Sequence, residues 1–341
     1  MAMDFKNGTI EMAHGSGGRA SAELIDKLFI KAFANPALAK KSDQAQLELS
    51  GKRIVMATDS HVISPLFFPG GDIGSLSVYG TVNDICMSGA KAMYLSAGFI
   101  LEEGFPLADL KRIVESMAEA AHYCGVKIVT GDTKVVERGQ ADGCYINTTG
   151  IGELAEGLDL SPGHIRPGDK IILSGSIGDH GISILARRQH LNLDTSLISD
   201  AQSLHDLVES MIASGADLRC MRDPTRGGLA AILNELAQAS GCSMQLQERA
   251  IPVKPEVNAC AELLGLDPLY IANEGKLIAI CSAQQAPELL AIMQNHPKGK
   301  DSAIIGEVLD TETRPVVELL TGFGGKRIVD WRYADPLPRI C

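Results

Sequence analysis

Four aspartates lie where a carboxylate can hold a metal ion or a phosphate group. Asp59 and Asp132 each follow an apolar stretch typical of a buried strand, Asp84 lies inside an apolar helical pattern, and Asp223 precedes a Pro-Thr-Arg-Gly-Gly turn. Hard carboxylate oxygens suit Mg²⁺, which usually takes one or two of them together with substrate phosphates. Taken singly, each aspartate is better explained as a turn or a helix cap. A carboxylate among apolar residues needs a partner, however, so the set predicts a Mg²⁺ site.

Three further charged residues can act on a bound nucleotide. Lys134 follows Asp132 by two positions in Gly-Asp-Thr-Lys, where a cation can bridge phosphate oxygens or stabilise charge in phosphoryl transfer. Arg226 precedes a predicted helix and is available for a phosphate. Glu274, beside a glycine in Asn-Glu-Gly-Lys, is a candidate general base. A solvated loop lysine and a simple turn remain the alternatives for Lys134 and Glu274.

A glycine-rich segment near the N-terminus is a candidate anion cradle. It precedes a predicted helix over residues 20–33, whose positive end favours a phosphate, and consecutive glycines let backbone N–H groups point inward. No Walker-type lysine follows, and a flexible loop explains the same residues equally well. The segment consists of His14, Gly15, Ser16, Gly17 and Gly18.

Cys341 ends the chain on a segment that contains two prolines, Asp-Pro-Leu-Pro-Arg-Ile-Cys. Proline-rich chain favours an extended conformation, so the segment reads as a semi-rigid arm that can carry a thiol into a pocket, although a frayed terminus is the alternative. The chain has eight cysteines with no Cys-x-x-Cys pair, which fits neither a disulfide framework nor a zinc site. The other seven lie mostly in apolar stretches and are expected to be inert, so Cys341 is the candidate reactive thiol.

Composition restricts the class of protein. A chain of 341 residues, 45% of them hydrophobic, is long enough for two domains with cores of their own. The net charge of −11 argues against a nucleic-acid surface and against binding to anionic lipid. No apolar run reaches the roughly 18 residues of a membrane helix, and the N-terminus lacks the pattern of a signal peptide. We therefore expect a cytoplasmic protein whose partners are proteins and small molecules.

Strand and helix patterns alternate along both halves and predict a mixed α+β fold. The clearest helix has apolar residues at helical spacing from Leu110 to Ala121, and Gly125 stops it. Polar loops are expected after the strands 54–58 and 126–130. The predicted divisions are a glycine-rich loop and helix at 1–35, an αβ domain that binds ATP at 36–153, a linker at 154–169, a second αβ domain at 170–310 and a tail at 311–341.

In order along the chain, HGSGG, TDSHVISPLFFPGGDIG, GTVNDICMSGA, TGDTKVVERG, GDHG, RDPTRGG, NEGK and the terminal PRIC resemble the HypE family of [NiFe]-hydrogenase maturation factors. The match runs from His14 to Cys341. The wider superfamily includes aminoimidazole ribonucleotide synthetase and shares a two-domain αβ fold with an ATP site. The resemblance implies a homodimer with a shared barrel-like sheet, ATP near the domain and subunit junction, and a flexible C-terminal tail. It also adds Asn83 and Thr133 to the cofactor site.

The resemblance further implies a reaction and its partners. The carbamoyltransferase HypF loads a carbamoyl group on Cys341, ATP drives its dehydration from thiocarboxamide to thiocyanate, and the cyano group passes to iron on the HypC–HypD complex. Two alternatives remain open. The chain can be a passive carrier that binds ATP and presents Cys341, or a transferase like selenophosphate synthetase, although its glycine-rich loop lacks the cysteine that such enzymes use.

Overall fold

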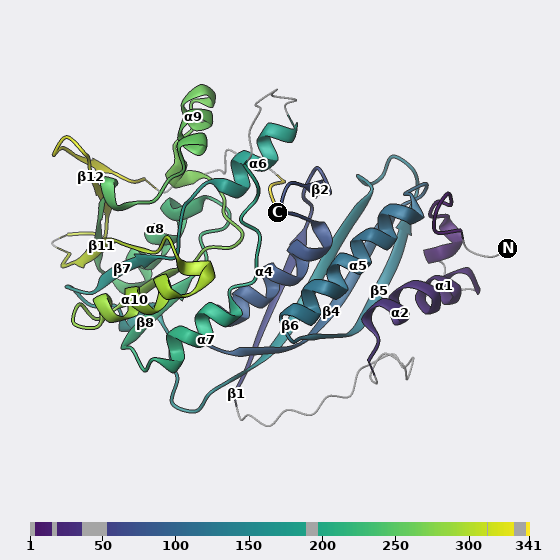
Figure 1. Cartoon of the computed structure of the whole chain (residues 1–341), viewed down its shortest axis with the longest axis horizontal. Helices are drawn as coiled ribbons and strands as arrows, with labels where there is room; N and C mark the ends of the chain where they lie inside the picture. The colour runs from purple at the N-terminus through teal and green to yellow at the C-terminus, as the bar shows by residue number, and fades with distance from the viewer. Residues whose placement is uncertain (1–3, 16–18, 36–52, 189–196, 312, 331–338) are drawn as a thin grey trace.

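A computed structural model describes residues 4–15, 19–35, 53–188, 197–311, 313–330 and 339–341. It shows a two-domain mixed αβ fold, with one sheet of four strands and another of seven (Figure 1). No helix in the described ranges is long and apolar enough to cross a membrane.

The first sheet has the strand order β1-β6-β4-β5. Only β4 and β5 pair in parallel, and the other neighbours are antiparallel. Helices α4 and α5 cover one face of this sheet, and the N-terminal helical segment lies beside α5 and β5 (Figure 1). The elements are the helical turns over 19–33 that include α1 (Arg19–Leu24) and α2 (Lys31–Phe33), β1 (Arg53–His61), α4 (Ile73–Met87), β4 (Lys91–Glu102), α5 (Leu107–Tyr123), β5 (Lys127–Val136) and β6 (Cys144–Leu154), with the short hairpin β2 (Phe67–Phe68) and β3 (Gly71–Asp72).

Local sequence explains the two helices on this sheet. Asp72 caps α4 by accepting hydrogen bonds from the backbone N–H groups of Gly74 and Ser75, in a capping box. The apolar face predicted for α5 is buried as expected, and Gly125 follows its end at a φ of 67°. The two helices therefore hold the sheet from one side and leave its other face open.

The second sheet has the order β13-β12-β9-β11-β7-β10-β8. Most of its neighbours are antiparallel, and β12 pairs with β9 in parallel. The elements are β7 (Lys170–Leu173), α6 (Asp179–Arg188), α7 (His205–Ala213), β8 (Leu218–Arg222), α8 (Gly228–Ser240), β9 (Ser243–Gln247), α9 (Pro255–Leu264), β10 (Ile278–Cys281), α10 (Ala286–Asn295), β11 (Ala303–Leu309), β12 (Val317–Leu320) and β13 (Lys326–Ile328).

The structure differs from the sequence predictions at four places in its strands. β1 continues to His61, and β5 continues to Val136 through the segment predicted as a polar loop. β8 was not predicted. β12 and β13 add to the second sheet, so residues 317–328 belong to a sheet rather than to a free tail.

The two halves share packing through α4. This helix contacts α7 and β8 of the second half, and one apolar cluster includes residues of both, such as Leu76 and Ala272. The C-terminus lies between the halves, next to α6 and β2 (Figure 1).

Candidate functional site

Strand β1 places Asp59 and His61 on its α4 side, because side chains two residues apart in a strand point to the same face. Gly80 of α4 faces both: a Cβ atom there would lie 3.1 Å from His61 Cε1 and 3.5 Å from Asp59 Oδ2. The glycine therefore lets the helix approach the strand. His61 is fully buried, its Nε2 lies 3.6 Å from Asp59 Oδ2, and neither ring nitrogen has a hydrogen-bond partner among the described residues.

Asp84 of α4 and Asp223 after β8 join Asp59. Burial, followed by the charges of Asp223 and Asp59, raises the pKa of Asp84 to about 7, although Arg222 and Arg226 oppose the rise. Burial raises the pKa of Asp223 to about 6, and Asp59 adds to this effect. The Asp84 side chain still reaches solvent on one side, although the surrounding protein is the main cause of its raised pKa. These carboxylates repel one another and favour a bound cation.

Glu274 completes this group from the loop that precedes β10. It is 5% exposed, and its Oε1 has no hydrogen-bond partner among the described residues. Burial raises its pKa well above the ordinary value, and Asp59, Asp200, Asp223 and Asp84 raise it further. We refer to Asp59, Asp84, Asp223 and Glu274 as the acid cluster. A glutamate with a raised pKa suits proton transfer near neutral pH.

Asn83 fixes the Glu274 loop relative to α4. Its Nδ2 donates to the backbone oxygens of Gln202 at 3.0 Å and Glu274 at 3.4 Å, and its Oδ1 accepts from the backbone N–H of Leu204 at 2.7 Å. Asn83 therefore acts in this chain as a buried anchor next to Asp84. The structure thus brings together six predicted site residues: Asn83, Asp59, Asp84, Asp223, Arg226 and Glu274.

Asp132, Thr133 and Lys134 lie elsewhere. They belong to β5, at the opposite edge of the first sheet from β1, and two strands intervene. Three strand spacings amount to about 14 Å. Lys134 Nζ forms an ion pair with Asp132 at 2.9 Å, and the two side chains are 64% and 66% exposed. Within one chain, therefore, Asp132 and Lys134 do not reach the acid cluster, and the expectation that all four aspartates converge is wrong for the single chain.

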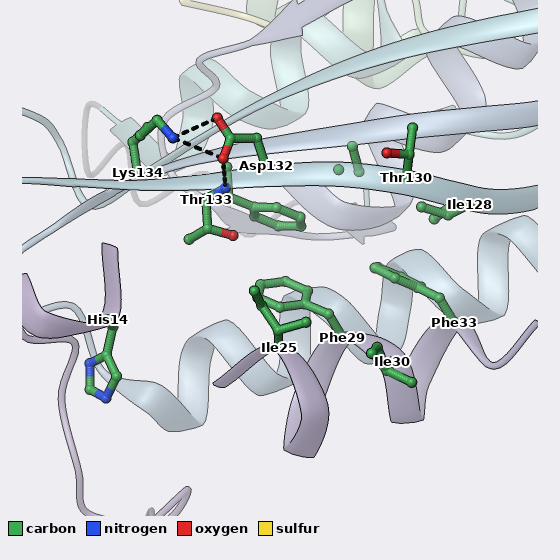
Figure 2. A pocket seen from close by; sticks show the side chains of 13 residues that line it. His14, Ile25, Phe29, Ile30, Phe33, Ile128, Thr130, Asp132, Thr133 and Lys134 are labelled. Atoms are coloured by element: carbon green, nitrogen blue, oxygen red, sulfur yellow. Dashed lines mark hydrogen bonds and ion pairs between the residues drawn. The ribbon is translucent and has the colours of Figure 1, made fainter. Parts of the chain in front are cut away.

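A separate cavity of about 210 Å³ lies between β5 and the N-terminal helical segment. Figure 2 shows apolar rings of Phe29 and Phe33 on the helical side, with Asp132 and Lys134 on the strand side and His14 near one end. Such a cavity can take a flat apolar group next to a charged one. Gly15 ends the short helical turn Met12–Gly15, whereas Ser16, Gly17 and Gly18 lie outside the described residues. The anion cradle predicted there is therefore not described by this structure.

Cys341 lies at the end of β1, because its backbone oxygen accepts a hydrogen bond of 3.0 Å from the N–H of Val62. His61 directly precedes Val62, and Asp59 lies three positions before Val62 on the same strand. Cys341 is 9% exposed and belongs to an apolar cluster, so the thiol is packed against the rest of the chain in this docked state. All eight cysteines are buried, and burial therefore does not distinguish Cys341 from the others.

The environment of the other thiols supports their expected inertness. Burial raises the pKa of Cys86 and Cys144 to about 12 and that of Cys220 to about 11, which suppresses the reactive thiolate. Burial raises the pKa of the Cys124 and Cys281 thiols as well.

Three residues that contact members of the acid cluster, directly or through one another, were not predicted. His61 follows Asp59 by two positions, and strand alternation was the signal for it. Asp200 accepts from the Glu274 N–H at 3.2 Å, and its Oδ2 lies 3.3 Å from the buried Lys276 Nζ. Lys276 stands in the Asn-Glu-Gly-Lys motif, whereas Asp200 has no local signature. The missed pair ties the Glu274 loop to the segment that precedes α7.

Comparison with known proteins gives the family. The models for AIR synthase related protein match at residues 41–154 for the N-terminal domain and 166–318 for the C-terminal domain. The chain is 61% identical to carbamoyl dehydratase HypE of Azotobacter vinelandii, over 99% of both chains. It is 49% identical to carbamoyl dehydratase HypE of Escherichia coli, over 97% of this chain and 99% of the relative. This chain belongs to the HypE family.

Solved structures of HypE proteins agree with this family assignment. A crystal structure of HypE in complex with ATP has a TM-score of 0.94 at 48% identity and covers 98% of this chain and 100% of that one. A crystal structure of a HypE–HypF complex has a TM-score of 0.79 at 47% identity and covers 90% of this chain and 99% of that one. Thiamine monophosphate kinase of Aquifex aeolicus, at 17% identity and a TM-score of 0.62 over 89% and 99%, shares the fold. The expected HypE membership is therefore confirmed, and with it the assignment to a family of ATP-dependent carbamoyl dehydratases.

Proposed function

We propose that this chain uses ATP to dehydrate a carbamoyl group carried as a thiocarboxamide on Cys341, and that the resulting thiocyanate supplies the cyanide ligand of [NiFe]-hydrogenase. One observation carries the proposal: the terminal residue docks on the end of β1, the strand that holds Asp59 of the acid cluster. The terminal residue thus lies against the end of the strand that carries one of these carboxylates, without a second protein. Holding a reactant in place in this way converts a bimolecular step into an intramolecular one.

The chemistry needs an activated oxygen and a base. The amide oxygen attacks the γ-phosphorus of ATP, and ADP leaves. Loss of the N–H protons then forms the C≡N bond while the C–O bond breaks and phosphate departs with the oxygen. Glu274 is our candidate to accept a proton, because it is buried, its Oε1 is unpartnered among the described residues and its pKa is raised. Lys134 is our candidate to stabilise charge on the transferring phosphoryl group.

The acid cluster fits a divalent cation. Asp59, Asp84 and Asp223 supply hard oxygens, and the burial and mutual repulsion that raise the pKa of Asp84 and Asp223 would be relieved by a bound cation. No three His, Cys, Asp or Glu side chains in the described ranges form a ready-made metal site. We infer that Mg²⁺ binds there together with nucleotide phosphates, where it would neutralise phosphate charge. Asp132 is the fourth predicted ligand, and it can contribute only from another chain.

A homodimer would place Lys134 and Asp132 at the acid cluster of the partner. Support comes from the open face of the first sheet, where Ile54 and Met56 are 58% and 68% exposed. Apolar residues on an uncovered sheet face favour a second copy, which would close the two sheets into a shared barrel-like structure. The cavity in Figure 2, with Asp132, Thr133, Lys134 and His14 at its wall, would then receive part of the ATP near the junction.

The proposed partners follow from the reaction. A HypE relative forms a complex with HypF, which makes HypF the proposed carbamoyl donor for Cys341. We propose the HypC–HypD complex in the cytoplasm as the acceptor of the cyano group. A passive carrier remains the second candidate, because it too would bind ATP and present Cys341.

The test is to load the chain with carbamoyl by means of HypF, add Mg-ATP and follow the mass of the C-terminal peptide. We expect the peptide to lose one water in the wild-type chain and to stay carbamoylated in Glu274→Gln. A carbamoyl group that persists in the wild-type chain would support the carrier.

A further inference from the structure

The last three residues of the chain pair with the segment that follows β1. The N–H of Val62 donates to the Cys341 oxygen at 3.0 Å, and that of Ser64 donates to the Arg339 oxygen at 3.4 Å. The Arg339 Nε in turn donates to the Val62 oxygen at 3.0 Å. Donors at alternate residues of one segment thus meet acceptors at alternate residues of the other. The chain end is therefore held in one register on β1, as an added strand would be.

His180, in the first turn of α6, contacts the residue that precedes Cys341. Its ring is fully buried, with Nε2 2.7 Å from the Ile340 carbonyl oxygen and Nδ1 2.7 Å from Ser199 Oγ. A carbonyl oxygen can only accept, so Nε2 carries the proton and donates it. In the neutral ring Nδ1 then accepts from the Ser199 hydroxyl, whose oxygen accepts from the Ala201 N–H at 3.0 Å. This chain of hydrogen bonds fixes the tautomer that recognises Ile340.

Arg188, in the last turn of the same helix, contacts the tail at a second point. Its guanidinium donates to the backbone oxygens of both Ser64 and Arg339, so it joins the two paired segments. Arg339 forms an ion pair of 2.5 Å with Asp142, in the turn between β5 and β6. Arg339 also has a φ of 56°, a left-handed conformation that is unfavourable in a residue other than glycine. The docked contacts must offset this cost.

We propose that His180 and Arg188 are positioning residues that hold the terminal Arg-Ile-Cys segment in register on the residues that follow β1, and so keep Cys341 beside the strand that carries Asp59. Both act through backbone carbonyls of the tail, and neither needs to touch the reacting atoms. Docking itself does not depend on the proposed function, whereas its effect on dehydration does.

The direct test measures how fast iodoacetamide alkylates Cys341 in the whole protein, from the mass of the C-terminal peptide. Docking leaves Cys341 only 9% exposed, so the wild-type thiol should react slowly. Losing a buried hydrogen bond costs about 1 kcal/mol or more, which predicts alkylation about five- to tenfold faster in His180→Ala and Arg188→Ala. His180→Gln, whose amide can still donate to Ile340, should restore most of the protection. Arg187→Ala removes the exposed neighbour of Arg188 and is the matched control.

A second measurement separates positioning from general damage. The two alanine variants should accept carbamoyl from HypF at least as fast as the wild type and lose water from it more slowly once Mg-ATP is added. If the wild-type chain never loses water but the alkylation rates still differ as expected, docking stands and the proposed function fails. If His180→Ala unfolds, Arg188→Ala decides, because Arg188 is only half-buried. Wild-type alkylation rates in folded Arg188→Ala and His180→Ala would overturn the proposal.

Discussion

Replacing Asp223 by Asn should stabilise the nucleotide-free protein at alkaline pH. The Asp223 side chain lies in the acid cluster, and burial raises its pKa from 3.8 to about 6. A raised carboxyl pKa means that the folded state binds the proton more tightly than the unfolded state does. The destabilisation is therefore absent below about pH 4, grows as the pH rises, and is complete above about pH 6. Asparagine keeps the shape and carries no charge at any of these pH values.

The size of the effect follows from the same values. A rise from 3.8 to about 6 corresponds to at most about 3 kcal/mol. Asp223 is only partly enclosed and titrates together with Asp84, so solvent screening and coupling reduce this limit. We expect the free energy of unfolding of Asp223→Asn to exceed that of the wild type by about 1 kcal/mol at about pH 8, with no difference at about pH 4.

Urea unfolding at the two pH values, with and without Mg-ATP, is the assay. Glu156→Gln, which removes an exposed carboxylate outside the acid cluster, is the control and should change little. Saturating Mg-ATP should stabilise the wild type more than Asp223→Asn, because the variant has one negatively charged ligand fewer for the cation. An Asp223→Asn variant less stable than the wild type at pH 8 would refute the reasoning, as would a difference that is equal at both pH values.

Three further predictions concern the reaction. Calorimetry should show that Cys341→Ala binds ATP normally, and mass spectrometry should show that it accepts no carbamoyl group. Carbamoylation of that variant would contradict the role of the terminal thiol. Glu274→Gln and Lys134→Ala should each accept carbamoyl but form thiocyanate about a hundredfold more slowly, and near wild-type rates would send the search for the base and the cation elsewhere. Since Lys134 lies about 14 Å across the sheet from β1, mixed dimers of Lys134→Ala and Glu274→Gln chains should regain activity that neither has alone. No gain on mixing would argue against a shared site.

Periodicity was the reliable part of the sequence. The apolar face of α5 and the alternating elements of both halves predicted the mixed αβ fold, because burial on one face leaves a regular pattern. The aspartates at strand ends and inside α4 predicted most of the acid cluster, because a carboxylate among apolar residues needs a charged or hydrogen-bonding partner.

Other features left no such pattern. β5 was predicted to end in a loop at Gly131, because polar residues on an exposed edge strand look like loop residues when the neighbouring strand is unknown. The distance between Lys134 and Glu274 depends on strand order, which no local motif encodes. His180 contacts the tail through a backbone carbonyl, which every residue type has, so the sequence of the tail does not predict this contact.

The stoichiometry of a single turnover tests the central claim most directly. The chain, carbamoylated on Cys341 and separated from HypF, is mixed with Mg-ATP, and ADP, phosphate and the mass of the C-terminal peptide are followed together. Docking of Cys341 at the strand of Asp59 predicts that this chain alone forms one thiocyanate for each ATP hydrolysed. Thiocyanate that forms with a non-hydrolysable ATP analogue, or ATP hydrolysis without loss of water from the peptide, would contradict it.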